Sequence, residues 1–198
     1  GELSGLLPSR TWKRARHDQT WFPGETLITG IGQGFFLVTP IQLATATAAL
    51  ANGGRLLQPN IVYAEQQANS DDLLPHQPRI LDTITVNEQQ HWDTVIKAMT
   101  EVVHSARGTA RRIGEDSPWM IAGKTGTAQV YGLKQEEKYD AEAIPEELRD
   151  HALFIAFAPV EEPKIAVAVI IEHGGGGGSV AAPVARAILD AYLQSSPP

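Results

Sequence analysis

The sequence has no cysteine among its 198 residues, so disulfide bonds and thiolate metal ligands are excluded. It also has no apolar run of the roughly 20 residues that a membrane-spanning helix needs. Positive charge is scarce, because the sequence has 16 Lys and Arg residues but 23 Asp and Glu residues. The resulting net charge of −7 argues against partners such as nucleic acid or an anionic membrane surface. The six histidines show no metal-ligand spacing. We therefore expect no metal site and no cofactor.

The composition is that of a folded globular protein, with 42% apolar and 20% charged residues. Residues 1–8 resemble a loop cut in mid-course, and residues 195–198 resemble a tail. We therefore expect residues 1–198 to be one part of a larger domain, and any membrane anchor to lie outside them.

Hydrophobic periodicity and capping residues predict a mixture of helices and strands. Residues 1–38 lack periodicity and are expected to be irregular, residues 55–84 to form short extended pieces, residues 134–150 a solvated loop or short helix, and residues 174–178 a flexible glycine-rich link. The expected helices cover residues 39–50, residues 85–107 with Thr85 in a capping box, and residues 180–193.

Three strands are expected, over residues 119–130, 152–158 and 164–171. The last two are near-continuous apolar runs, which favours a sheet covered on both faces. The five residues between them are short enough for an antiparallel hairpin.

The first of these strands contains Lys124-Thr125-Gly126, which is one of three short motifs in the active sites of penicillin-binding proteins and serine β-lactamases. The lysine provides a fixed positive charge, and the threonine hydroxyl can donate to a carboxylate. Glycine leaves room for a substrate to lie against the strand, and the Thr127 backbone N–H would point to a developing oxyanion.

The other two motifs, Ser-x-x-Lys with the nucleophile and Ser-x-Asn, do not occur in these residues. One alternative is a nucleotide-binding loop, because Gly123-Lys124-Thr125 matches the end of Gly-x4-Gly-Lys-Thr. Pro118 stands where the first glycine should be, and the residues after the lysine favour a strand over a helix. The glycines at 30, 32 and 34 miss the dinucleotide-binding spacing, and we expect that loop to be structural or to line the site.

Further motifs occur in order along nearly the whole chain, and together they resemble the class B penicillin-binding proteins, above all the elongation transpeptidases of Gram-negative bacteria. The motifs lie at residues 8–13, 30–34, 39–44, 52–54, 108–110, 122–134, 148–151 and 157–159. The resemblance implies the C-terminal portion of an α/β (α+β) penicillin-recognising serine transpeptidase domain, with an antiparallel sheet flanked by helices. The missing serine motifs would lie before Gly1.

The resemblance also implies a function. The parent protein would cross-link D-Ala-D-Ala stem peptides of peptidoglycan through a serine acyl-enzyme, and β-lactams would acylate the same serine. Lys124, Thr125 and Gly126 would hold the substrate or drug, and the Thr127 N–H would form half of the oxyanion hole. The partners would be a RodA-type membrane glycan polymerase and the elongation machinery, at the periplasmic face of the inner membrane. A non-catalytic structural or interaction module remains the alternative for residues 1–198 alone.

Overall fold

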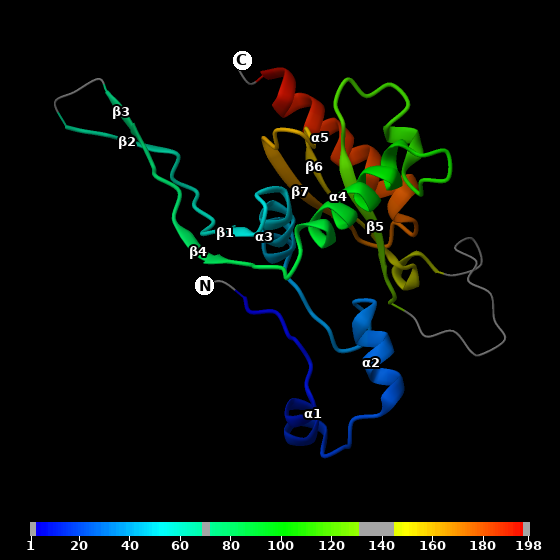
Figure 1. Ribbon diagram of the computed structural model, residues 1–198. Coiled ribbons are helices and arrows are strands. Elements are labelled where there is room, and N and C mark those ends of the chain that lie inside the picture. The colour runs from blue at the N-terminus through cyan, green and yellow to red at the C-terminus, as the bar shows by residue number, and fades with distance from the viewer. Residues whose placement is uncertain (1–2, 69–71, 131–144, 196–198) are drawn as a thin grey trace.

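A computed structural model describes residues 3–68, 72–130 and 145–195 of the chain, and its centre is a three-stranded antiparallel sheet (Figure 1). The strands are β5 (Ala122–Ala128), β6 (His151–Ala158) and β7 (Ile165–Ile171), in the order β5-β6-β7. All three were predicted, and β6 and β7 form the expected hairpin. The predicted mixture of helices with an antiparallel sheet is confirmed.

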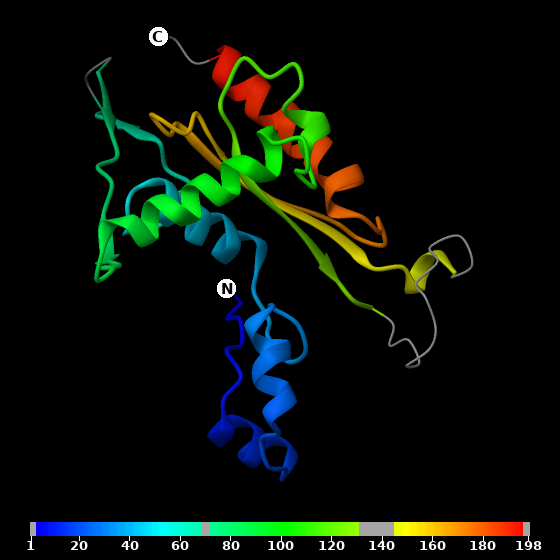
Figure 2. The same cartoon turned by 45° about the vertical axis from the view of Figure 1, so that its right-hand side comes forward.

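The C-terminal helix α5 (Ala182–Ser195) covers one face of the sheet. The even-numbered residues of β6, among them Phe154, are fully buried on this face against apolar side chains of α5 that include Leu189. Because side chains alternate along a strand, the odd-numbered residues of β6 lie on the opposite face. Figure 2 shows α5 and helix α3 (Pro40–Ala51) on opposite sides of the sheet.

Helix α3 begins where the sequence predicted. Thr39 is its N-cap and accepts a hydrogen bond from the Gln42 backbone N–H at 3.2 Å, while the Gln42 side chain accepts from the Thr39 N–H at 3.0 Å. This reciprocal capping box, with Pro40 in the first turn, satisfies two of the otherwise unpaired helix donors. The helix thereby starts at a fixed point beside β6 and β7.

Residues 1–38 were expected to be irregular, and this is wrong for two stretches. Helix α1 (Arg10–His17) begins at its N-cap Ser9, and helix α2 (Pro23–Gly30) begins at a proline. The buried position of α1 is filled by Lys13, whose Nζ contacts Glu25 Oε1 of α2 at 2.5 Å and lies 4.5 Å from the centre of the Phe22 ring. Because a charged residue occupies the buried position, hydrophobic periodicity could not reveal this helix.

Residues 55–83 contain short extended pieces, as expected, and these form two antiparallel pairs. Strand β1 (Arg55–Leu57) pairs with β4 (Ile80–Thr83), and β2 (Ala64–Gln66) pairs with β3 (Leu73–Pro75). The two pairs extend away from the central sheet (Figure 1). In the acidic segment predicted over 134–150, residues 134–144 lie outside the described part, and a single 3-10 turn, η2, covers Glu146–Leu148.

Helix α4 (Gln89–His104) starts four residues later than Thr85, where its beginning was predicted. The Ile84 N–H donates to Gly54 O at 2.8 Å, so the chain is still held extended beside Gly54 at that point. Glu88 is the N-cap residue, and its side chain makes no capping bond. A 3-10 turn, η1 (Arg111–Ile113), follows α4 and leads back toward β5.

The last residue of α4 is joined to the chain just before β5. The Ile121 backbone N–H donates to His104 Nε2 at 2.9 Å, and this bond requires the neutral imidazole, which has a lone pair to accept with. Burial lowers the pKa of His104 below its ordinary value, and the Arg186 guanidinium lowers it further, against an opposing effect of Glu161. The start of β5 is thus tied to a histidine held neutral.

None of the helices in the described ranges is long and apolar enough to cross a membrane.

Protonation of His104 is expected to destabilise the protein. Because the pKa of His104 is lower in the folded than in the unfolded state, its contribution is complete above the ordinary histidine pKa of about 6.5 and is lost as the pH falls below it. Glutamine keeps a hydrogen-bond acceptor but does not titrate. We therefore expect the His104→Gln variant to lose less unfolding free energy between pH 7.5 and 5.5 than the unsubstituted protein loses. Urea unfolding measures this difference. His91→Gln, at an exposed position of the same helix, is the control, and equal pH dependence of all three proteins would contradict the assignment.

Candidate active site

The four residues predicted to form the site lie together on β5. Lys124 pairs with Ile155 of β6, and Gly126 pairs with Leu153. β5 is paired with β6 along one side, and no strand of the described part pairs with its other side, which is therefore an open edge. The predicted strand is confirmed, and among the described strands it is an edge strand of the sheet.

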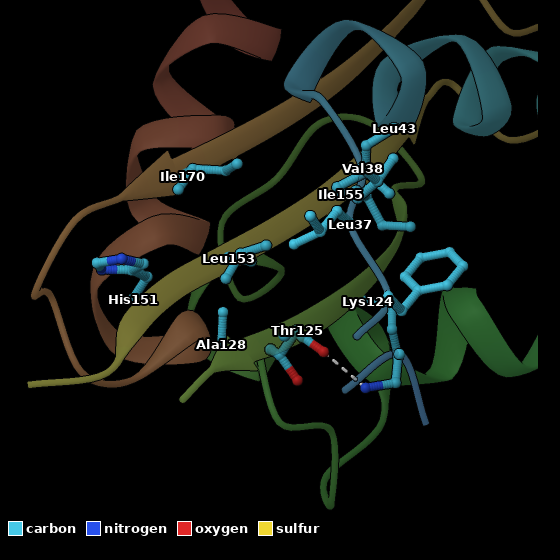
Figure 3. Close-up of a pocket in the computed structure, with 13 residues that line it drawn as sticks. Leu37, Val38, Leu43, Lys124, Thr125, Ala128, His151, Leu153, Ile155 and Ile170 are labelled. Atoms are coloured by element: carbon cyan, nitrogen blue, oxygen red, sulfur yellow. Dashed lines mark hydrogen bonds between the residues drawn. The ribbon is translucent and has the colours of Figure 1, made fainter. Parts of the chain in front are cut away.

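Lys124 projects onto the sheet face opposite α5, where it borders an apolar cavity of about 360 Å³ (Figure 3). The sheet forms one wall of the cavity, and the segment before α3 forms another. The lining residues are Gly32, Phe36, Leu37, Val38, Leu43, Lys124, Thr125, Gly126, Ala128, His151, Leu153, Ile155 and Ile170. Lys124 places a positive charge at the border of these largely apolar walls. Because an apolar wall screens a charge less than water does, the screening is weaker on the side of the cavity.

The Lys124 side chain reaches round to the open edge of its own strand. Its Nζ donates to the Thr125 carbonyl oxygen at 2.7 Å, which is the dashed line in Figure 3. This bond shows that the Thr125 carbonyl points away from β6. The ammonium remains exposed, so it borders both the cavity and the open edge.

The loop at residues 30–34 reaches the same edge. Gln33 Nε2 donates to the Thr127 carbonyl oxygen at 2.6 Å, across 94 positions of sequence. Since the N–H and C=O of one residue point to the same side of an antiparallel strand, the Thr127 N–H also faces the open edge. This loop was expected to be structural or to line the site, and the second alternative is favoured by the Gln33 bond and by Gly32, which borders the cavity.

The Thr125 side chain lies on the other face of β5 from Lys124. Its hydroxyl is 3.1 Å from the hydroxyl of Thr109, a residue in the loop between α4 and η1. Thr125 borders the cavity, but its hydroxyl is turned toward Thr109 on the opposite face of the strand. A ligand that contacts the Lys124 ammonium and the Thr125 hydroxyl together would therefore lie along the open edge of β5.

The glycine run at 174–178 packs directly against the motif strand. Residues Gly177–Ala181 form a π-helical turn, η3, that leads into α5. A Cβ at Gly177 would collide with the Leu153 carbonyl oxygen and lie 2.5 Å from Gly126 O, and a Cβ at Gly178 would lie 3.4 Å from Thr125 Cγ2. These glycines permit a close approach beside the site, which is more than the flexible link expected from the sequence.

The nucleotide-binding alternative is wrong. A phosphate-binding loop requires a helix that begins directly after the lysine, with its N–H groups directed at the phosphates. Here the chain continues as a strand to Ala128. The N–H groups of this strand point alternately toward β6 and toward the open edge, so they do not converge on one phosphate. Among the described residues, no cluster of three or more His, Asp or Glu is arranged to hold a metal ion.

Sequence reasoning placed Lys124, Thr125, Gly126 and Thr127 correctly on one strand, but it missed the residues that contact them. Thr109 and Gln33 were noted only as parts of longer motifs. Their contacts with β5 join positions far apart in sequence, and no local pattern in a single sequence reports such a contact. Both residues become visible as site neighbours only in the folded chain.

An antiparallel sheet flanked by helices, with Lys-Thr-Gly on one of its strands, is the arrangement that the resemblance to penicillin-binding proteins implied. Residues 1–190 match the family model of the penicillin binding protein transpeptidase domain, and the chain belongs to this family. The class that the motifs indicated is thereby confirmed.

Individual relatives point to penicillin-binding protein 2. The peptidoglycan D,D-transpeptidase MrdA of Haemophilus influenzae is 40% identical over 198 residues, which is all of this chain and 30% of that protein. The crystal structure of Pseudomonas aeruginosa PBP2 in complex with WCK 5153 matches 99% of this chain and 40% of its own, with 45% identity and a TM-score of 0.79. PBP2 of Helicobacter pylori, solved in complex with MreC, matches 98% of this chain and 32% of its own, with 31% identity and a TM-score of 0.76.

Gly177→Ala is expected to disturb the site strand. The new methyl group would meet backbone atoms of β5 and β6, which cannot rotate away, so we expect a loss of about 1–3 kcal/mol of unfolding free energy. Chemical denaturation of the protein that contains this chain measures the loss.

Gly176→Ala is the matched control for this substitution. Its φ of −92° suits any residue, and its Cβ would meet the Ser179 hydroxyl, 2.7 Å away on a side chain that can rotate. The close-packing argument fails if the two variants are equally stable.

Proposed function

We propose that this chain supplies the substrate-holding strand of a serine-type peptidoglycan D,D-transpeptidase that β-lactams acylate. The observation that carries the proposal is the placement of Lys124 through Thr127 at an open sheet edge, beside a cavity bordered by the lysine. The family and the relatives named D,D-transpeptidase support it. Because the chain spans about 30% of the length of the curated relatives it matches, the activity belongs to the whole protein.

An extended stem peptide would bind by adding a strand to β5. The carbonyl oxygens of Thr125 and Thr127 face the open edge, where Lys124 and Gln33 now donate to them. A peptide strand would exchange main-chain hydrogen bonds with this edge, and Gly126 would leave space for it. Strand addition at this edge explains how a flexible peptide is held in one register.

Electrostatics would fix the end of the substrate. A stem peptide ends in a carboxylate, β-lactam drugs carry one, and the Lys124 ammonium lies beside the largely apolar wall of the cavity. Attraction between the two charges is therefore stronger than in bulk water. The Thr125 hydroxyl would donate to the same carboxylate, and this contact is possible only if the carboxylate lies along the strand edge.

The reaction would proceed in two balanced steps. The serine oxygen bonds to the carbonyl carbon of the penultimate D-Ala, the peptide C–N bond breaks, and the terminal D-Ala leaves with the proton on its amine. The amine of a neighbouring stem then attacks the ester and loses a proton, and the serine regains its hydroxyl. In each step the Thr127 N–H would donate to the oxyanion of the tetrahedral intermediate.

The serine nucleophile and its lysine would come from a part of the protein outside residues 1–198, since the sequence has no Ser-x-x-Lys. We further propose that the protein works at the periplasmic face of the inner membrane with a RodA-type glycan polymerase and the elongation machinery. The complex of Helicobacter pylori PBP2 with MreC supports an assembly of this kind.

A polypeptide of residues 1–198 alone is expected to form no covalent adduct with penicillin, because it lacks the nucleophile motif. Intact-mass measurement after incubation with the drug checks this. A stable mass increase equal to that of the drug, mapped to one of these serines, would contradict the assignment of the nucleophile to another segment.

Lys124→Ala in the whole protein is expected to slow acylation by penicillin on the order of 100-fold, because the charge that holds the carboxylate is lost. Its unfolding free energy should change by less than about 0.5 kcal/mol, because the side chain is exposed. Stopped-flow acylation and urea unfolding measure the two effects. Lys97→Ala, at an exposed lysine of α4, is the control. Equal acylation rates of Lys124→Ala and the parent would refute the proposed function.

A further inference from the structure

Two parts of the chain that are distant in sequence meet at the side chain of Thr125. The loop after α4 contributes the Thr109 hydroxyl, 3.1 Å from the Thr125 hydroxyl. The turn η3 contributes Gly178, where an added Cβ would lie 3.4 Å from Thr125 Cγ2 and would collide with the Thr109 carbonyl oxygen. The methyl and the hydroxyl of Thr125 thus each have a neighbour on the face away from the cavity.

The backbone on both sides of Thr109 is firmly held. The Gly108 N–H donates to Ser105 O at 2.9 Å, and the Ala110 N–H donates to Val102 O at 3.0 Å. Ala110 is 1% exposed, and a Cβ at Gly108 would collide with the Val102 carbonyl oxygen. Thr109 itself is exposed, so its side chain has room for a ligand or solvent beside it. Because its backbone is fixed, Thr109 holds its hydroxyl at a constant position beside the Thr125 hydroxyl.

The direction of the hydrogen bond follows from hydroxyl chemistry. A hydroxyl has one proton to donate and two lone pairs that accept, whereas an ionised carboxylate only accepts. When Thr125 donates its proton to a carboxylate, its oxygen remains free to accept, and Thr109 is the neighbour that donates to it. A donated hydrogen bond also polarises the Thr125 hydroxyl and strengthens its own bond to the anion.

We propose that Thr109 is a positioning residue, which donates to Thr125 Oγ1 and thereby aims the Thr125 proton at the carboxylate of the stem peptide or β-lactam. This inference rests on the proposed function. Thr109 touches the motif residue and not the reacting atoms. Its contribution is therefore specific to ligands that carry the carboxylate.

The test uses the whole protein that contains this chain and compares Thr109→Val with Thr109→Ser. Valine keeps the shape and removes the hydroxyl, whereas serine keeps the hydroxyl. The probes are penicillin and its methyl ester, which lacks the anionic carboxylate. We expect Thr109→Val to lower the second-order acylation rate constant for penicillin about tenfold, the factor equivalent to 1.4 kcal/mol. The ester should react with variant and parent at rates within about twofold, and Thr109→Ser should restore the penicillin rate.

Thr94→Val is the matched control, since Thr94 is an exposed threonine of α4 whose hydroxyl donates to Gln90 O at 2.6 Å within the helix. Thermal unfolding of every variant shows whether the fold is intact, and Thr109→Ala replaces Thr109→Val if the valine variant does not fold. An equal loss with penicillin and ester, or no rescue by serine, would overturn the inference. If Thr109→Val reacts with penicillin at the normal rate while Lys124→Ala is slowed, only the inference about Thr109 is overturned. If Lys124→Ala is acylated at the unchanged rate, the proposed function itself is overturned.

Discussion

The pairing of β5 with β6 on one side only is the constraint from which the arrangement of the site follows. It leaves the carbonyl oxygens of Thr125 and Thr127 facing an open edge, and the alternation of side chains along the strand places Lys124 and Thr125 on opposite faces of the sheet. The lysine ammonium borders the apolar cavity and the threonine hydroxyl meets Thr109, so the edge between them is where one ligand could contact both groups.

The two faces of the sheet differ in how tightly they are packed. On the α5 face, Phe154 and Leu189 are fully buried, and glycines allow the turn η3 to touch the strand backbone. On the other face, α3 and α4 cover one end of the sheet, and the other end borders the cavity. A rigid face therefore supports the strand from behind, while the face that carries the lysine has space in front of it. Such a division suits a binding strand, because its geometry is fixed by packing that the ligand does not have to displace.

Much of this fold could be predicted from local patterns, and the exceptions have physical reasons. Thr39-Pro40 marked the start of α3, and the apolar runs of β6 and β7 marked the hairpin, because caps and buried strands leave local traces. Helix α1 left only its N-cap Ser9 as a local trace, since Lys13 fills its buried position and the partner that makes this possible, Glu25, lies in another helix. The same holds for the site. The motif itself is local and was predictable, whereas the contacts of Thr109 and Gln33 depend on tertiary packing.

Gly123 also fixes the register of the motif strand, because it prevents β5 from sliding along β6. Gly123 pairs with Ala156, and a Cβ at this position would lie 2.6 Å from Cζ of the diagonal neighbour Phe154, so only glycine fits beside that buried ring. Sliding β5 by one residue in either direction would place Ala122 or Lys124 there, and both carry a Cβ. A one-residue slip would also exchange the faces of lysine and threonine. Gly123 thus acts as a register lock, and the strand should tolerate many substitutions at exposed positions far better than a single inserted or deleted residue.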